Sequence, residues 1–253
     1  MDCIKEWLSP SDPSINLENN LRQRQQGTCR WLLDSDTYHS WRTTPGSFFW
    51  LHGLSGCGKT VLASSVIEQL RSQTPKSLFA YFYFDVNGGG RRDLSQMLRS
   101  VLCQLFLEEG GKDVLLSLYR DCGMGLRQPS IKQLSDTFAS ILHQVGEVTI
   151  VVDALDECST PEDVVLWLKD PSRFMHNWHL LVTSQKHGTM SSVIDSWHRQ
   201  DQIHAVQIDK VNSDIACYVH ERLFGSAEFV KWSSHQGLRE QVEDEILKQA
   251  NGM

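Results

Sequence analysis

The chain has 253 residues, of which 40% are hydrophobic and 22% are charged, so it can bury a substantial core and is not a disordered segment. Its 31 acidic side chains outnumber 24 Lys and Arg, which argues against a broad DNA or RNA surface but leaves room for a small basic pocket. The seven cysteines suggest neither a disulfide framework nor a zinc site, because no two of them are three residues apart. No apolar run of about 18 residues and no signal sequence is visible, which predicts a cytoplasmic protein without a membrane span.

Residues 1–45 are polar and rich in tryptophan, and prolines interrupt any long helix. We expect this stretch to be a lead-in that packs on a larger domain. From Ser47 onward, short and nearly continuous apolar runs are typical of buried strands. The expected strands are residues 47–52, 78–84, 148–152, 179–183 and 203–208.

Helical patterns lie between these strands. Apolar residues recur at spacings of three and four over residues 94–106, where Asp93 is the expected N-cap. A second helix is expected from Ser130, with Gln133 completing a capping box, and a third from Pro161. Two further helices are expected at residues 213–224 and 240–250. The alternation predicts an α/β fold, with a five-stranded parallel sheet flanked by helices.

The first expected strand runs into the turn Gly53-Leu-Ser-Gly-Cys-Gly-Lys-Thr60 and then into a helix, which is the G-x-x-x-x-G-K-[ST] pattern in its required setting. Its glycines let the backbone curl so that successive N–H groups can surround a phosphate. Lys59 would reach the β- and γ-phosphates, and the Thr60 hydroxyl would be a magnesium ligand. The residues predicted to bind nucleotide here are Gly53, Ser55, Gly56, Cys57, Gly58, Lys59, Thr60 and Val61.

This turn has two other interpretations. A glycine-rich turn without a ligand is disfavoured by the strand-to-helix context. A Gly-x-Ser-x-Gly nucleophile elbow centred on Ser55 is excluded, because Cys57 stands where that pattern needs glycine.

Carboxylates follow the third expected strand directly, in Ile150-Val-Val-Asp-Ala-Leu-Asp-Glu157. Because carboxylates and phosphates repel one another without a cation between them, we expect Asp153 to hold magnesium. Asp156 and Glu157 could orient or deprotonate an attacking water, and Lys59 completes the predicted catalytic set. A solvated acidic turn that caps the next helix is the alternative for Asp156 and Glu157.

The number of strands narrows the class of P-loop protein. One strand lies in sequence between the two motif strands, and two more follow the second. This count fits the P-loop group in which another strand separates the motif strands in space, which is an ATPase or switch architecture and not that of a small nucleotide kinase.

With these motifs, the chain resembles the NACHT nucleotide-binding module of fungal NOD-like receptors, within the STAND signal-transduction NTPases, including nephrocystin-like N-terminal sequences. The resemblance spans nearly the whole chain, and its more specific parts are the lead-in motif and the double-acidic third-strand motif. Besides the turn at 53–60, the matching segments are Trp7-Leu-Ser-Pro10, Gly27-Thr-Cys-Arg-Trp-Leu-Leu33, Tyr81-Phe-Tyr-Phe-Asp85, Asp153-Ala-Leu-Asp-Glu-Cys158, Leu181-Val-Thr-Ser184 and Asn212-Ser-Asp-Ile215.

The resemblance implies a switch that binds ATP or GTP with Mg²⁺, and whose packing against helical partners and oligomerisation change on nucleotide exchange or slow hydrolysis. It therefore implies protein partners or self-association through helical surfaces, and not nucleic acid. Fungal relatives act in non-self recognition and cell death, and they usually carry effector and repeat domains that are not in this sequence. The implied organisation is a lead-in at 1–45, a NACHT P-loop NTPase core at 46–211, and the start of a truncated helical lid region at 212–253.

The sequence departs from the family after the fourth strand, where the usual Ser-Arg is Ser184-Gln185. Gln185 can donate a hydrogen bond but brings no charge, which predicts weaker discrimination of triphosphate from diphosphate and slow hydrolysis, unless Lys186 substitutes. The resemblance also implies that Thr28 and Trp31 could lie near the base and ribose, while an ordinary core position is the alternative for Trp31.

Two alternatives to a hydrolysing switch stay open. The first is an interaction module that binds nucleotide without hydrolysing it, which Gln185 and the missing domains favour. The second is a truncated gene product with no independent role.

Overall fold

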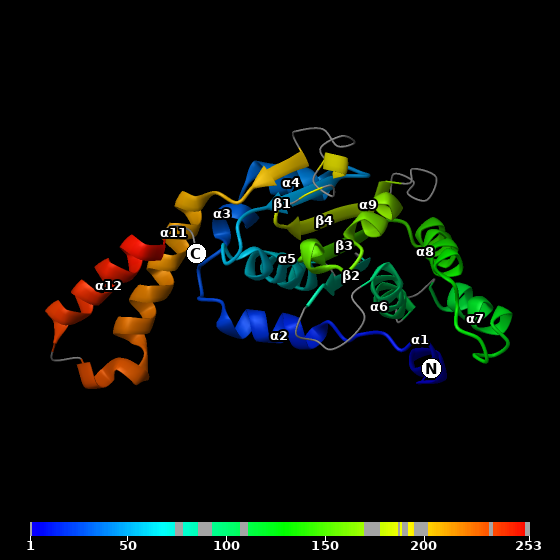
Figure 1. Ribbon diagram of the computed structural model, residues 1–253, viewed down its shortest axis with the longest axis horizontal. Helices are drawn as coiled ribbons and strands as arrows, with labels where there is room; N and C mark the ends of the chain where they lie inside the picture. The colour runs from blue at the N-terminus through cyan, green and yellow to red at the C-terminus, as the bar shows by residue number, and fades with distance from the viewer. Residues whose placement is uncertain are drawn as a thin grey trace.

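The computed structural model describes residues 2–73, 78–85, 93–106, 111–169, 178–186, 188, 192–194, 202–232 and 235–250. At its centre is a five-stranded sheet in which every neighbouring pair is parallel, in the order β2-β3-β4-β1-β5 (Figure 1). The strands are β1 (Phe48–His52), β2 (Leu78–Tyr83), β3 (Val148–Asp153), β4 (Trp178–Ser184) and β5 (Ile203–Ala205). Because β4 lies between β1 and β3, the predicted separation of the two motif strands is confirmed.

The last strand is shorter than the sequence suggested. It ends at Ala205, and α11 (Ile208–His220) begins where the strand was expected to end. Val206 N still donates to His52 O at 2.7 Å, but β1 stops at His52. Residues 207 and 208 therefore have no β1 residue to pair with, and the chain enters α11 at Ile208 instead of extending the strand.

Alternate residues of the strands face two hydrophobic clusters, one on each side of the sheet. Phe48 and Trp50 belong to a cluster with α1 (Asp2–Leu8), α6 (Leu94–Phe106), α8 (Ile131–Val145) and α9 (Pro161–Lys169), and α7 (Gly111–Asp121) packs beside these helices. Phe49 and Leu51 belong to the other, with α5 (Lys59–Gln73) and the lead-in helices α2 (Ser14–Gln23), α3 (Arg30–Leu33) and α4 (Asp36–Thr43). The sheet is covered on both faces, as predicted for parallel strands.

The three helix starts expected at Asp93, Ser130 and Pro161 are confirmed. Asp93 Oδ1 accepts a hydrogen bond from Gln96 N at 2.9 Å, and α6 follows at Leu94. Ser130 and Gln133 form both bonds of a capping box, and α9 begins at Pro161.

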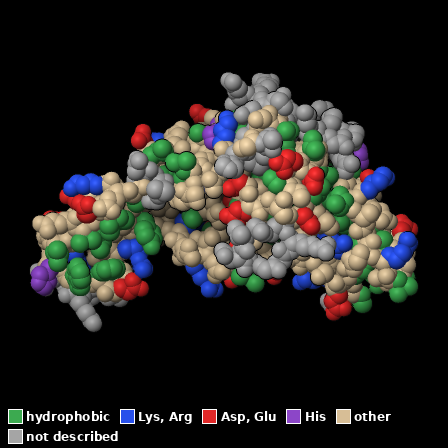
Figure 2. Space-filling model, in the orientation of Figure 1, with side chains coloured by type: hydrophobic (Ala, Val, Ile, Leu, Met, Phe, Trp, Pro, Cys, Tyr) green, Lys and Arg blue, Asp and Glu red, His purple; other side chains and the backbone are tan. Residues whose placement is uncertain are grey.

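An arm formed by residues 208–250 extends from the sheet edge (Figure 1). It contains α11, a π-helical turn (Glu221–Gly225), a 3-10 turn (Ala227–Trp232) and α12 (Gln236–Ala250), so both expected helices start four or five residues earlier than predicted. Hydrophobic side chains gather on the visible face of the arm (Figure 2). Within the described ranges, no helix is both long and apolar enough to span a bilayer.

Candidate functional site

The loop between β1 and α5 has the conformation that its glycines allow. Gly56 and Gly58 have φ angles of +79° and +80°, in the left-handed region that glycine enters without strain. A β-carbon at Gly58 would meet no atom within 4 Å, so the space outside the loop at this point is open. The loop therefore curves as expected of a phosphate-binding turn, with Ser55 exposed and Cys57 buried.

Gly53 has a different role from the other two glycines. A β-carbon there would lie 2.7 Å from Cys57 Sγ and 3.1 Å from Val206 Cβ. The sequence interpretation assigned all three glycines to loop curvature, whereas the structure shows close packing as the constraint at Gly53.

Lys59 lies at the first position of α5, with its ammonium turned back onto the loop. Its Nζ donates to Gly53 O at 2.9 Å and to Leu54 O at 2.7 Å. These carbonyl groups hold the side chain at the mouth of the loop, and an anion bound there would compete for the same ammonium.

Asp153 ends β3 beneath this loop and is only 2% exposed. Its Oδ1 accepts a hydrogen bond from Thr183 Oγ1 at 2.5 Å. Burial raises the pKa of Asp153 to about 6, while hydrogen bonds from Thr183 and Thr60 and the charge of Lys59 act in the opposite direction. The structure thus brings together Asp153, Thr60 and Lys59, three residues predicted to act at one site.

The oxygen atoms at this position suit a hard divalent cation. The raised pKa means that burial disfavours the charged form of Asp153, and a bound cation would stabilise that form. A carboxylate and a hydroxyl are also typical Mg²⁺ ligands, which phosphate oxygens and water complete. Thr60 and Asp153 therefore fit the predicted magnesium site.

The acidic turn after β3 is tied to the end of β4. Ala154 has φ of +55°, and its N–H donates to Thr183 Oγ1 at 3.0 Å. In the 3-10 turn η1 (Leu155–Glu157), Asp156 Oδ1 accepts from Gln185 N at 3.0 Å. Asp156 thus binds the backbone of Gln185, the residue that follows β4. The proposed action of Asp156 and Glu157 on water stays a prediction.

Gln185 is partly buried beside this turn, and its backbone holds Asp156. The next residue, Lys186, places its Nζ 5.8 Å from the ring centroid of Trp50. The structure places both residues at the carboxyl end of β4, and the role of either toward a γ-phosphate stays a prediction.

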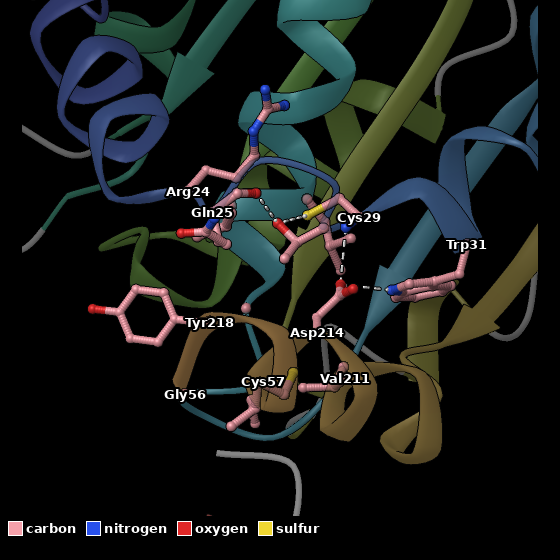
Figure 3. Close-up of a pocket in the computed structure, with 14 residues that line it drawn as sticks. Arg24, Gln25, Cys29, Trp31, Gly56, Cys57, Val211, Asp214 and Tyr218 are labelled. Atoms are coloured by element: carbon pink, nitrogen blue, oxygen red, sulfur yellow. Dashed lines mark hydrogen bonds between the residues drawn. The ribbon is translucent and has the colours of Figure 1, made fainter. Parts of the chain in front are cut away.

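A cavity of about 180 Å³ adjoins the loop (Figure 3). Three segments enclose it, namely the lead-in at residues 24–31, the loop and first turn of α5 at 56–62, and α11 at 211–218. Thr28 and Trp31 line it, as do Cys57 and Val61 of the predicted binding set. Trp31 also packs against the hydrophobic cluster that contains Phe49 and Leu51, which is the core position expected as its alternative. Its place near a base and ribose stays a prediction.

Asp214 joins α11 to the lead-in across this cavity, and sequence reasoning gave it no role. Its Oδ2 accepts from Cys29 N at 2.9 Å and from Trp31 Nε1 at 3.1 Å (Figure 3). The only signal in the sequence was that Asp214 belongs to the segment Asn212–Ile215, which carried part of the family resemblance. Nothing local indicated that it would meet residues more than 180 positions earlier.

Comparison with known proteins agrees with this geometry. A family model described as "Nephrocystin 3, N-terminal" matches residues 27–185, more than half of the chain. The chain belongs to this family. The part matched by the nephrocystin 3 N-terminal model starts at the lead-in motif, includes the loop and the acidic turn, and ends at Gln185.

This nephrocystin 3 N-terminal domain is similar to one fungal protein, the vegetative incompatibility protein HET-E-1 of Podospora anserina. The two are 27% identical over 139 residues, which are 51% of this chain and 10% of the relative. The chain thus spans about a tenth of the length of that relative. Together, the two matches support a NACHT-like domain.

Among solved structures, a DNA replication initiation factor aligns with 89% of this chain and 60% of its own, with 12% identity and a TM-score of 0.45. That likeness is too distant to bear on function. The P-loop assignment rests on the strand order and the loop described above.

Proposed function

We propose that the chain is a nucleotide-operated signalling switch that binds a purine nucleoside triphosphate with Mg²⁺ and hydrolyses it slowly. The observation that carries the proposal is the convergence of Lys59, Thr60 and Asp153 at the carboxyl ends of β1 and β3, with β4 between these strands. ATP and GTP both fit this part of the site.

In the proposed complex, the loop from Gly53 to Thr60 surrounds the phosphates, and Lys59 exchanges its bonds to the loop carbonyl groups for phosphate oxygens. Mg²⁺, held by Thr60 and Asp153, would supply charge neutralisation to the triphosphate. Asp156 and Glu157 orient the attacking water. Gln185 brings no charge to the γ-phosphate, which is why we expect slow turnover.

We further propose that the switch acts in the cytoplasm, in non-self recognition or programmed cell death, and contacts protein partners or other copies through its helical surfaces. The printed name of the relative, a vegetative incompatibility protein, supports this role. The apolar side chains on the arm support a protein contact there (Figure 2).

The test is a calorimetric titration with ATP and GTP in Mg²⁺, followed by single-turnover phosphate release, on the wild type and Lys59→Ala. Lys132→Ala is the control, because Lys132 is an exposed lysine on α8 that pairs only with its helix neighbour Asp136 among the described residues. We expect Lys59→Ala to weaken binding at least tenfold and Lys132→Ala to change nothing.

Each outcome discriminates between functions. Binding with slow phosphate release supports the switch. Binding without release supports the second candidate, the non-hydrolysing interaction module that the uncharged Gln185 favours. No binding by well-folded protein contradicts both, and bound nucleotide in hundredfold excess over Kd should stabilise the fold by about 2.7 kcal/mol.

A further inference from the structure

The cavity beside the loop carries an inference about which base the site accepts, and it rests on the proposed nucleotide-binding function. The cavity adjoins the loop, so it offers a place for the base and ribose of a nucleotide whose phosphates lie in the loop. The cavity of about 180 Å³ shares Gly56, Cys57 and Gly58 with that loop. We propose that Asp214 makes this site select guanine over adenine.

One carboxylate oxygen of Asp214 is left for a ligand. Oδ2 accepts the N–H groups of Cys29 and Trp31, which fixes the orientation of the side chain at the cavity wall (Figure 3). In the part of the chain that the structure describes, no donor is found for Oδ1. A carboxylate oxygen in a mostly apolar cavity is stabilised by any N–H group that a ligand offers.

The residues around Asp214 supply no further hydrogen-bond donor to its free oxygen among those that the structure describes. Apolar side chains of Leu62, Val211 and Ile215 line the same cavity and offer the carboxylate no hydrogen bond. Arg24, the cationic side chain in the lining, is paired with Glu68 at 2.6 Å. Among the described residues, the hydrogen-bond donors to Asp214 are therefore the two N–H groups on Oδ2.

The two purines differ in what they present to such an oxygen. Guanine carries two adjacent donors, N1–H and the 2-amino group, on its Watson–Crick edge. Adenine carries one amino group beside the N1 lone pair, which a carboxylate repels. A site built around an acceptor discriminates strongly against an analogue that lacks the matching N–H group. Gln25, on the opposite segment of the cavity, has an amide that can donate to O6 of guanine.

Asp214→Asn reverses the polarity of this contact with little change of shape. Cys29 N and Trp31 Nε1 are both donors, so they require the amide oxygen, and the NH₂ group must face the cavity. The variant thus offers a donor where the wild type offers an acceptor. Xanthine, which has a carbonyl oxygen in place of the 2-amino group, then becomes the complementary base.

The experiment is calorimetric titration of the wild type and Asp214→Asn with GTP, ATP, ITP and XTP in Mg²⁺. Asp209→Asn is the matched control, since Asp209 is an exposed carboxylate in the first turn of the same helix. We expect the wild type to bind GTP at least tenfold more tightly than ATP, with ITP between them because it lacks the 2-amino group. We expect Asp214→Asn to weaken GTP binding at least tenfold. It should tighten the binding of XTP and of ATP, because O2 of xanthine and N1 of adenine can each accept a hydrogen bond from the new NH₂ group.

Equal affinity of the wild type for GTP and ATP would overturn the selection of guanine while leaving the proposed function in place. If Asp214→Asn lost affinity equally for all four nucleotides, Asp214 would serve only to hold α11, and the selection of guanine would again be overturned. Failure of the wild type to bind any of the four would overturn the proposed function together with this inference.

Discussion

The loop at residues 53–60 and the cavity beside it serve one proposed ligand, but they are built in different ways. The loop is a single run of eight residues whose conformation follows from its own glycines. The cavity is assembled from three segments, and the hydrogen bonds of Asp214 join residues 183 and 185 positions apart. A contiguous site can therefore be read from a sequence, whereas a site assembled by tertiary contacts requires the structure.

The largest effect is expected beside the loop, where Asp153→Asn should change the free energy of unfolding. The folded-state pKa of Asp153, about 6, lies above its ordinary value of 3.8. The folded protein therefore binds the extra proton, and stability falls as pH rises from about 4 through 6. The variant avoids that loss, so without Mg²⁺ its free energy of unfolding at pH 7.5 should exceed that of the wild type by up to about 3 kcal/mol.

Urea unfolding at pH 7.5 and pH 4 measures this difference, which should nearly vanish at the lower pH. In the same variant, Mg²⁺ should no longer tighten nucleotide binding. Asp136→Asn, an exposed carboxylate on α8, is the control. Parallel stability curves for the wild type and Asp153→Asn would contradict the burial argument.

Gln185→Arg tests whether charge at the end of β4 controls the state of the switch. An arginine there adds a charge-assisted bond to the γ-phosphate, so we expect about tenfold greater preference for triphosphate over diphosphate, and faster hydrolysis. Gln185→Lys, which adds the charge without the planar fork, is the comparison variant. Unchanged turnover and preference in Gln185→Arg would show that the missing charge is not what limits the site.

On the cavity side, Trp31→Phe removes the indole donor to Asp214 and keeps an aromatic ring. The loss of one hydrogen bond to a carboxylate should cost about 1 kcal/mol and loosen α11. Hydrogen exchange of residues 208–220 should become several-fold faster, with that of α8 unchanged. Equal exchange in α11 of both proteins would show that the Cys29 bond alone holds Asp214.

The smallest effect is expected at Ala154, which adopts φ of +55° in the turn after Asp153. A left-handed conformation costs a residue with a β-carbon about 1 kcal/mol, and glycine avoids that cost. The greater freedom of glycine in the unfolded chain offsets part of the gain. Ala154→Gly should therefore raise the free energy of unfolding by about 0.5 kcal/mol in urea titration. A decrease would show that the backbone of Ala154 is not strained.

Local signals account for what the sequence predicted well. The Asp93 cap, the capping box at Ser130 and the apolar strands depend on neighbours within a few residues, and the structure confirms them. The end of β5 depends instead on where β1 stops, and the first turn of α11 follows from that. The packing at Gly53 and the bonds of Asp214 likewise depend on distant partners, so no local pattern could reveal them.

The crowding at Gly53 has a mechanical consequence. Val206 donates its N–H to His52 O, and its side chain occupies the volume that a β-carbon on the next residue, Gly53, would need. The entry to the loop and the exit toward the arm are thus interlocked across the sheet edge. If the arm moves far enough to shift Val206, the hydrogen bond to His52 O moves the end of β1 with it. The loop begins at the next residue, Gly53, so a movement of the arm reaches the loop through one peptide bond.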